Sequence, residues 1–219
     1  MPSQAVQRIS VRWLPEPAYE DTTTIALNVG GYFIDLRVAK QDQTIQWSRA
    51  GERIALKKEP PTFRWTRIID SSGILDADEA YFEKLDNGDD LEIGTTGCPH
   101  KNGAMTDYEE IWRDITAKRS PTEPSWILQR KDGNAFVGKV GAIYLAIQQI
   151  PGGGFAVRRE DREASSGKWS MSYESGDVDN LPSAAQAVEV LETGDQVWTE
   201  GQAVALGGSE YVVKGLSTN

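Results

Sequence analysis

The sequence is poor in the residues that most often cross-link a chain or carry catalysis. Its 219 residues include one cysteine, Cys98, and one histidine, His100. A single thiol closes no intramolecular disulfide, and this pair is too small to be the ligand set of a tetrahedral zinc site. The first residues also lack the basic and apolar segments of a secretory signal peptide. We therefore expect a cytoplasmic protein, with the nucleus as a second compartment, that depends on neither disulfides nor zinc.

Basic residues are in deficit and long apolar segments are missing. Against 23 lysines and arginines stand 33 aspartates and glutamates, which gives a formal net charge of -10. The field of such a chain repels the phosphates of nucleic acids and anionic lipid surfaces. No apolar run approaches the roughly 20 residues of a membrane-spanning helix. We therefore expect a soluble globular protein with no nucleic-acid partner and no membrane insertion.

Glycine, in contrast, is abundant and stands in turn signals. Pairs such as Asn87-Gly88 and Asp132-Gly133 recur along the chain, and short runs between them alternate in polarity or are rich in β-branched and aromatic residues. This pattern is typical of antiparallel strands in a β-sandwich or β-barrel. The predicted strands cover residues 9–14, 22–28, 32–39, 44–48, 63–69, 126–130, 140–150, 155–159, 168–173, 196–199 and 211–214.

Helical patterns are confined to two segments, residues 76–85 and 183–191. The first offers apolar side chains at helical spacing, and the second is rich in alanine and begins after Pro182-Ser183. A third segment is ambiguous, because residues 106–109 have the form of a helix capping box. We interpret residues 108–115 as a strand that closes the first barrel.

The two halves of the chain share short similar segments in the same order. Residues 32–37 resemble 143–148, Trp47-Ser48 resembles Trp169-Ser170, and residues 85–89 resemble 191–195. A polar stretch with two prolines, residues 118–124, has the composition of a linker between the halves. We therefore predict an all-β fold of two tandem antiparallel barrels, each with a short helix, over residues 1–118 and 119–219.

No segment has the spacing of a known catalytic or cofactor site. Cys98-Pro99-His100 brings the only thiol and imidazole together, but the proline between them limits their mutual reach, and we interpret them as a loop without chemistry. The glycines at 152–154 lack the spacing of a phosphate-binding loop, and the Gly-x-Ser-x-Gly motif is missing. We assign no catalytic, cofactor-binding or metal-binding residue, and expect neither enzymatic activity nor a cofactor.

Two further features suggest binding. Residues 70–92 contain nine carboxylates and one lysine, which indicates a solvated acidic surface or a docking face for a basic protein. The sequence also has seven tryptophans and seven tyrosines. Inward-facing aromatic side chains of a small barrel either fill its core or line an apolar pocket. The tryptophans to which this choice applies are Trp13, Trp47, Trp126 and Trp169.

Two blocks of the sequence resemble a known family. The first comprises IGTTGC at residues 93–98, KNGA at 101–104 and YEEIWR at 108–113, and the second comprises SGKWSMSY at 166–173 with Leu181-Pro182 and Gly194-Asp195. Both resemble the fungal casein-kinase-I-interacting (Hrr-interacting) protein family. The resemblance implies two calycin-type, lipocalin-like barrels in tandem and a fungal protein of cytosol and nucleus. It brings no catalytic motif that could be transferred to this chain.

These observations lead to one functional hypothesis and one alternative. The hypothesis is a non-enzymatic, monomeric protein-interaction module, whose partner by resemblance is a casein-kinase-I-type kinase. The alternative is a lipocalin-type carrier that binds a small apolar ligand inside a barrel.

Overall fold

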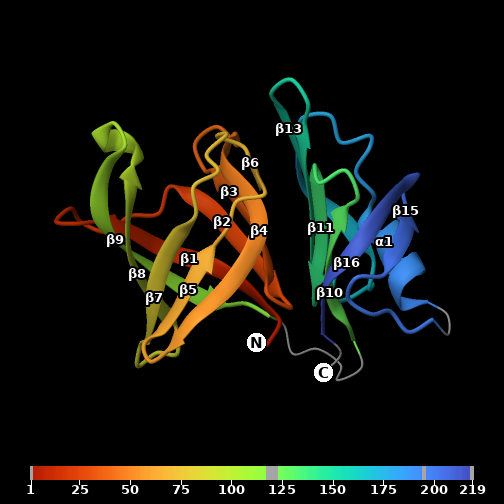
Figure 1. Ribbon diagram of the computed structural model, residues 1–219, viewed down its shortest axis with the longest axis horizontal. Helices are drawn as coiled ribbons and strands as arrows, with labels where there is room; N and C mark the ends of the chain where they lie inside the picture. The colour runs from red at the N-terminus through yellow and green to blue at the C-terminus, as the bar shows by residue number, and fades with distance from the viewer. Residues whose placement is uncertain (1, 117–122, 194–195, 218–219) are drawn as a thin grey trace.

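The structure is a computed structural model that describes residues 2–116, 123–193 and 196–217, and its regular elements are nearly all strands (Figure 1). The first sheet is formed by β1 (Gln4–Trp13), β2 (Thr22–Val29), β3 (Tyr32–Ala39), β4 (Ile45–Lys58), β5 (Pro61–Trp65), β6 (Ile69–Asp70), β7 (Asp78–Lys84), β8 (Asp90–Cys98) and β9 (Ala104–Asp114). A short 3-10 helix, η1 (Pro99–Lys101), lies between β8 and β9.

The first sheet closes into an eight-stranded antiparallel barrel. Its strand order is β3-β2-β1-β9-β8-β7-β5-β4, and β3 pairs with β4 to complete the ring. The two-residue strand β6 pairs with β4 outside that ring. Because β9 pairs with both β1 and β8, the predicted strand at residues 108–115 is confirmed as part of the closure. The predicted all-β barrel in the first half is therefore confirmed.

The second half forms a sheet that does not close. Its order is β14-β13-β12-β11-β10-β16-β15, and β14 and β15 form its two edges in the part of the chain that the structure describes. The predicted second barrel is therefore not confirmed. The strands are β10 (Ser125–Arg130), β11 (Ala135–Val140), β12 (Ile143–Ile150), β13 (Gly154–Arg162), β14 (Trp169–Ser175), β15 (Ala203–Leu206) and β16 (Ser209–Ser217).

One α-helix, α1 (Ala184–Glu192), covers a face of this open sheet. Ser183 caps its first turn reciprocally with Gln186, which explains why the helix begins there and confirms the prediction for residues 183–191. Ala184, Ala187 and Leu191 face the sheet and pack on side chains such as Trp126 and Tyr144. Within the described residues, no helix has the length and apolarity needed to cross a membrane.

Several predicted elements were wrong in kind or extent. The strand predicted over residues 63–69 is divided into β5, which ends at Trp65, and β6, which begins at Ile69. Residues 76–85 contain strand β7 instead of a helix, because β7 is held by backbone pairing to β5 and β8 and its side chains alternate across the barrel wall. The predicted strand at 140–150 is divided by a turn at Gly141 into β11 and β12. Residues 196–199 form no strand, since the sheet edge there is supplied by β15.

The main hydrophobic core lies between the barrel and the open sheet, which stand side by side in Figure 1. Strand β3 shows how the chain builds it: Ile34, Leu36 and Val38 point out of the barrel into this core. From the open sheet, Phe136 and Leu145 pack into the same cluster. Since successive side chains of a strand face opposite sides, the remaining residues of β3 point into the barrel.

The similar segments of the two halves map onto the structure unevenly. Residues 32–37 and 143–148 fall on β3 and β12, each the third strand of its sheet along the chain. Trp47 lies in β4 and Trp169 in β14, which do not hold equivalent positions in their sheets. Residues 194 and 195 of the last match and the predicted boundary after residue 118 lie outside the described residues. The tandem duplication stays a prediction.

A tight backbone approach between the barrel and the open sheet provides a test of their packing. A Cβ on Gly215 of β16 would lie 2.2 Å from the carbonyl oxygen of Val29 at the end of β2. We expect Gly215→Ala to force the sheets apart and to lower the free energy of unfolding by about 1–3 kcal/mol, the usual cost of overpacking. Urea unfolding measures the change. Gly154→Ala is the control, because its added methyl group meets only the Ile150 side chain; equal midpoints for both variants would contradict the prediction.

Candidate functional site in the barrel interior

The interior of the barrel is charged. Phe33, Asp35 and Arg37 are the inward-facing residues of β3, on the opposite side from the apolar residues that form the main core. Arg49 of β4 and Glu110 of β9 also lie inside and are buried. A buried charge is tolerated only when it is paired and hydrogen-bonded, so the question is how these groups neutralise one another.

They do so in a continuous chain of ion pairs across the barrel. Glu110 accepts hydrogen bonds at Oε1 from Arg8 of β1 and, at 2.9 Å, from Arg37. Arg37 also donates to Asp35 Oδ2 at 3.1 and 3.2 Å. Arg49 contacts the same Oδ2 atom at 3.4 Å. The chain therefore links β1, β9, β3 and β4 through alternating charges.

At its far end the chain continues through Arg49 to Asp78 of β7. Arg49 Nη1 donates to both carboxylate oxygens of Asp78, at 3.0 and 2.8 Å. Trp47 stacks against the cations: its ring centre lies 4.8 Å from the Arg37 guanidinium and 4.1 Å from that of Arg49. The indole thus covers two buried cations with the negative face of its ring.

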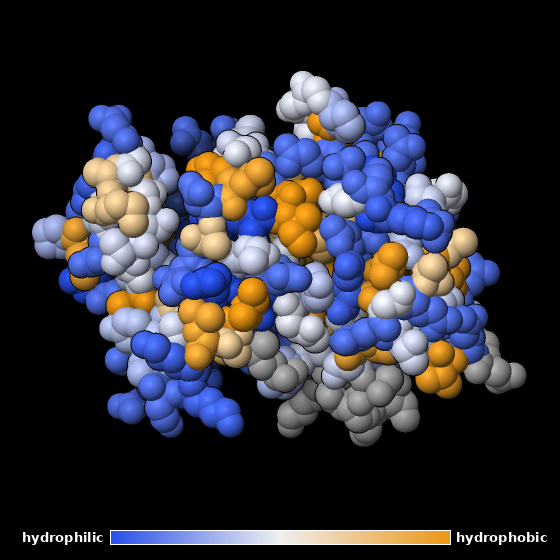
Figure 2. Space-filling model, viewed as in Figure 1, coloured by the Kyte–Doolittle hydropathy of each residue, from blue (hydrophilic) through white to orange (hydrophobic). Residues whose placement is uncertain are grey.

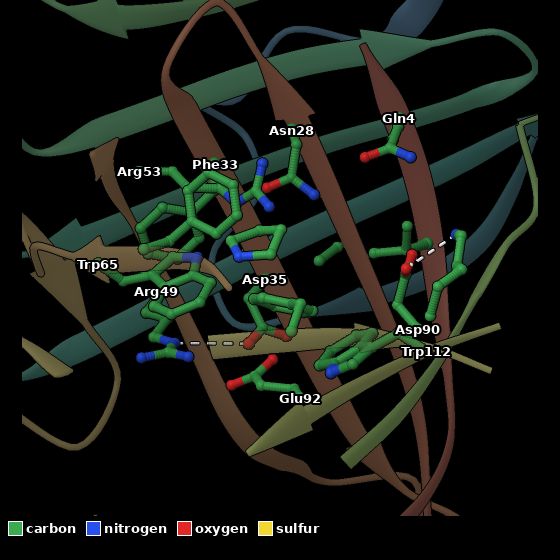
Figure 3. A pocket seen from close by; sticks show the side chains of 16 residues that line it. Gln4, Asn28, Phe33, Asp35, Arg49, Arg53, Trp65, Asp90, Glu92 and Trp112 are labelled. Atoms are coloured by element: carbon green, nitrogen blue, oxygen red, sulfur yellow. Dashed lines mark hydrogen bonds and ion pairs between the residues drawn. The ribbon is translucent and has the colours of Figure 1, made fainter. Parts of the chain in front are cut away.

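A cavity of about 260 Å³ lies next to this ion-pair chain (Figure 3). It is partly open to solvent and extends to the end of the barrel that contains Gln4, Lys84 and Asp90. The space exists because the inward residues of β1 and β2 are small here: Val6 and Ala26 face larger side chains across the barrel. The full lining is Gln4, Val6, Ala26, Asn28, Phe33, Asp35, Arg49, Arg53, Pro61, Phe63, Trp65, Phe82, Lys84, Asp90, Glu92 and Trp112.

Aromatic side chains form one wall of the cavity. Phe63 lies 6.1 Å from Trp65 and 5.7 Å from Phe82, measured between ring centres. The Arg53 guanidinium lies 3.7 Å from the centre of the Phe63 ring. Burial lowers the pKa of Arg53 to about 10, so it stays cationic at neutral pH. The cavity therefore joins flat apolar surfaces to a positive charge.

Glu92 of β8 lies on the wall as a buried carboxyl group. Burial raises its pKa to about 8, and the neighbouring charge of Glu110 acts in the same direction, so Glu92 is largely protonated at pH 7. Tyr108 donates a hydrogen bond of 2.7 Å from its hydroxyl group to Glu92 Oε1. Gly94 makes room for that ring, because a Cβ there would lie 2.8 Å from the Tyr108 ring.

The pKa of Glu110 is shifted in the opposite direction from that of Glu92, although the two residues are cross-strand partners. Burial would raise its pKa, but the guanidinium groups of Arg37 and Arg8 outweigh burial and hold the pKa of Glu110 at about 2. Two adjacent carboxyl groups thus differ in charge at neutral pH. The difference follows from their neighbours, since Glu110 lies between two cations and Glu92 accepts from a neutral phenol.

The only thiol and imidazole meet a carboxylate just beyond the end of β8 that is farther from Asp90. Cys98 Sγ lies 3.4 Å from His100 Nδ1 and 3.6 Å from Nε2, and Nε2 lies 2.9 Å from Glu16 Oε2. Cys98 is fully buried among aromatic side chains. A thiol that lies almost equally near both ring nitrogens and contacts no solvent lacks the directed, accessible geometry of a Cys-His nucleophile. The described residues contain no cluster of three or more acidic, cysteine or histidine groups suited to a metal ion.

The acidic stretch at residues 70–92 does not form a single face. Asp78 and Glu92 point into the barrel, Asp89 binds Arg113, and Glu79 binds Arg64. The four tryptophans singled out in the sequence also separate. Trp47 covers the ion-pair chain, and Trp13 packs in the cluster that contains the cavity residues Phe33 and Trp65. Trp126 and Trp169 belong to the cluster of the open sheet.

The tryptophans that line the cavity, Trp65 and Trp112, were missed by the sequence analysis. A signal for the site is present in β3, where apolar and charged residues alternate from Ile34 to Val38. Such alternation indicates one apolar and one polar face, and in a closed barrel one of these faces must lie inside.

Comparisons with known proteins place the chain in a family. A family model described as Protein HRI1 matches residues 4–203. The chain belongs to the HRI1 family. This agrees at family level with the resemblance carried by the two sequence blocks. No curated protein matches this HRI1-family chain.

A solved structure with the same fold is similar to this HRI1-family chain over nearly its whole length. It is the crystal structure of the uncharacterized protein YLR301w from Saccharomyces cerevisiae, with a TM-score of 0.74 and 15% sequence identity. The match covers 98% of this chain and 99% of the yeast chain. At this identity the similarity shows a common fold.

The raised pKa of Glu92 predicts a specific pH dependence of stability. In the unfolded chain a glutamate has a pKa near 4.3, so the native state holds a proton that the unfolded state has lost between about pH 4.5 and 8. The contribution of Glu92 to the free energy of unfolding therefore falls as pH rises through that window. We expect Glu92→Gln, which retains the acceptor for Tyr108, to unfold at higher urea concentration than the wild type at pH 8 but not at pH 4.

The size of this effect is set by the difference between the two pKa values, about 1.4 kcal/mol for each unit. Glu83→Gln, on the exposed side of β7, is the matched control and should show no such pH-dependent gain. Parallel stability curves for the Glu92 variant and the wild type from pH 4 to pH 8 would show that Glu92 is ionised in the native state.

Proposed function

We propose that this HRI1-family chain is a non-enzymatic binding protein whose small ligand occupies the cavity inside the barrel. The observation that carries the proposal is the partly open cavity of about 260 Å³, with aromatic and polar side chains on its wall. Ligand sites in proteins commonly combine apolar surfaces with a few convergent polar groups. A barrel that served only as a packed scaffold would have side chains filling this space.

The dimensions of the cavity restrict the ligand. Its volume lies just below the range of about 300–1,000 Å³ that holds drug-sized molecules. Haem, a retinoid or a folded fatty-acid chain needs more room. The ligand that we propose is therefore smaller, about one or two fused rings, and its flat faces pack against Phe63, Trp65 and Phe82.

We propose in addition that the protein has no enzymatic activity. Two carboxyl groups with separated pKa values resemble the acid and base of a hydrolytic enzyme. Here, however, Glu110 is held by two arginines and Glu92 by Tyr108. Neither carboxyl group lies beside an activated nucleophile, and both are occupied in holding the barrel interior together.

Filling the cavity tests the proposal. We expect Ala26→Leu to fold but to lose binding of ring-sized probes, because the larger side chain occupies the space beside the aromatic wall. The measurement is calorimetric titration with naphthalene and indole, and with oleic acid, haem and retinol as probes that should be too large. Ala205→Leu, which places the same side chain on an exposed position of β15, is the control.

The outcomes separate clearly. Saturable binding of a ring-sized probe that is lost in Ala26→Leu and kept in Ala205→Leu supports the proposal. If neither ring-sized probe binds the wild-type protein, or if binding survives in Ala26→Leu, the cavity is not a ligand site of this kind.

A second candidate function is docking of a protein partner, for which a casein-kinase-I-type kinase is the proposed partner. The observation that favours it is the loop between β6 and β7, where Ile74 and Leu75 are 47% and 66% exposed. On the face drawn in Figure 2, apolar side chains form small separate patches among hydrophilic ones. A small exposed apolar loop provides an anchor of the kind that protein interfaces bury.

Docking through this loop predicts a loss of affinity without loss of fold. We expect Leu75→Ser to weaken binding of a purified casein-kinase-I catalytic domain at least about fivefold, since a buried leucine anchor contributes more than about 1 kcal/mol. Surface plasmon resonance measures the affinity. Val197→Ser, at an exposed position in the second half of the chain, is the control. An affinity unchanged by Leu75→Ser would exclude this loop as the docking site.

A further inference from the structure

Arg53 of β4 brings a cation to the aromatic wall of the cavity. It is the cross-strand partner of Trp65 in β5, and its guanidinium group lies 3.7 Å from the centre of the Phe63 ring. At that distance the face of the guanidinium group packs on the ring, so its N–H groups point along the plane of the stack. Arg53 and Phe63 are both partly exposed and line the cavity, so a molecule that enters it can reach both.

Asn28 of β2 lies beside this cation. Both side chains line the cavity, both border a second, smaller depression at the turn between β2 and β3, and they lie close together in Figure 3. The side-chain amide of Asn28 is partly exposed and makes no hydrogen bond to another described residue. An amide nitrogen donates two hydrogen bonds, so Asn28 can add a donor to those of Arg53. Two neighbouring groups that donate favour a ligand that accepts.

The other ionisable groups of the cavity wall nearly cancel one another in charge. Arg49 and Asp35 belong to the ion-pair chain, in which each cation is bound by a carboxylate. Lys84 is bound by Asp90 at 2.8 Å. Glu92 has a pKa of about 8 and is therefore largely uncharged at pH 7. Together these five groups contribute almost no net charge.

Arg53 therefore gives the cavity wall a net positive charge at neutral pH. Burial lowers its pKa to about 10, although the carboxyl groups of Glu92 and Asp90 act in the opposite direction. The protein thus compensates only part of the hydration that this cation loses. A ligand with one negative charge adds to that compensation, because a carboxylate accepts two parallel N–H groups of a guanidinium group. A cationic ligand would be repelled.

The shape of the cavity restricts the rest of the ligand. The rings of Phe63 and Phe82 favour a flat molecule that packs on them, and the volume of about 260 Å³ leaves no room for a long chain. A phosphate ester would bring a second negative charge, which a single added cation does not balance.

We propose that the cavity binds a small planar aromatic acid, whose single carboxylate accepts hydrogen bonds from Arg53 and Asn28 and whose ring packs against Phe63. This inference rests on the proposed ligand-binding function and adds the charge of the ligand to it. Binding of an uncharged ring is the part that belongs to the proposed function alone.

Three related probes separate the two statements. Naphthalene-2-carboxylate carries the charge, naphthalene-2-carboxamide has nearly the same shape without the charge, and naphthalene has no polar group. We expect the carboxylate to bind the full chain at pH 7 at least about tenfold more tightly than either of the other two, because hydrogen bonds between charged groups are stronger than those of neutral groups. Calorimetric titration measures the three affinities.

Arg53→Gln removes the cation and keeps a hydrogen-bond donor. We expect this variant to bind naphthalene-2-carboxylate about tenfold more weakly than the wild type, with little change for naphthalene. Arg64→Gln is the matched control, because Arg64 also lies in the barrel wall but its side chain is 47% exposed and binds Glu79. It removes the same charge without touching the cavity and should leave all three affinities unchanged.

Asn28→Asp tests the same side of the cavity with a side chain of nearly the same size, and it decides the matter if Arg53→Gln does not fold. The introduced carboxylate repels the probe and competes with it for Arg53. We expect the affinity for naphthalene-2-carboxylate to fall at least about tenfold, while the affinity for naphthalene changes little.

Each result decides between the two statements. If the three probes bind with equal affinity, or if the preference for the carboxylate survives in Arg53→Gln or Asn28→Asp, the inference is overturned while the cavity stays a ligand site. Equal losses for naphthalene and the carboxylate in these variants also overturn it, since they show a structural role only. If no probe binds, both statements fail. A preference for the carboxylate that is lost in Arg53→Gln and Asn28→Asp and kept in Arg64→Gln supports the inference.

Discussion

The chain of ion pairs inside the barrel is the interaction on which the structure depends most. Asp35 stands at its centre, because its Oδ2 atom joins Arg37 to Arg49 and thereby connects the Glu110 and Asp78 ends. Loss of one member of a buried ion pair typically costs about 3–5 kcal/mol, since the partner is left charged and unpaired. The barrel is therefore cross-linked from within by charge, beside an aromatic cluster that includes Phe33 and Trp65.

This charged interior explains why the barrel needs the open sheet. With polar groups inside, the apolar residues of β2 and β3 face outward, and an exposed apolar surface of that size would favour aggregation. The open sheet covers it and in turn buries the matching face of β11 and β12. The other face of the open sheet is covered by α1. Each half thus covers an apolar face of the other, and side chains from both halves form the main core.

The sequence allowed most strands of the barrel and helix α1 to be predicted, because alternation and capping are local signals, but β8 at residues 90–98 was not among the predicted strands. It did not distinguish β7 from a helix, since Ala80 and Phe82 suit either periodicity and only pairing with β5 and β8 decides. The open second sheet was missed for a similar reason, because closure depends on edge strands distant in sequence. Among the site residues, Asp35 and Arg37 alternate with apolar residues, a signal from which the sequence analysis drew no site, and their meeting with Glu110 requires the folded barrel.

A fixed network of charges also accounts for the survival of a cavity in a protein interior. Apolar side chains around an empty space relax partly into it, because close packing is favourable and their contacts are not directional. Asp35 and Arg49 are constrained differently: each is bound by several hydrogen bonds from different strands, and moving either one would leave a charge unpaired. The same bonds that stabilise the barrel therefore prevent its collapse onto Ala26, and a cavity with oriented polar atoms is the consequence.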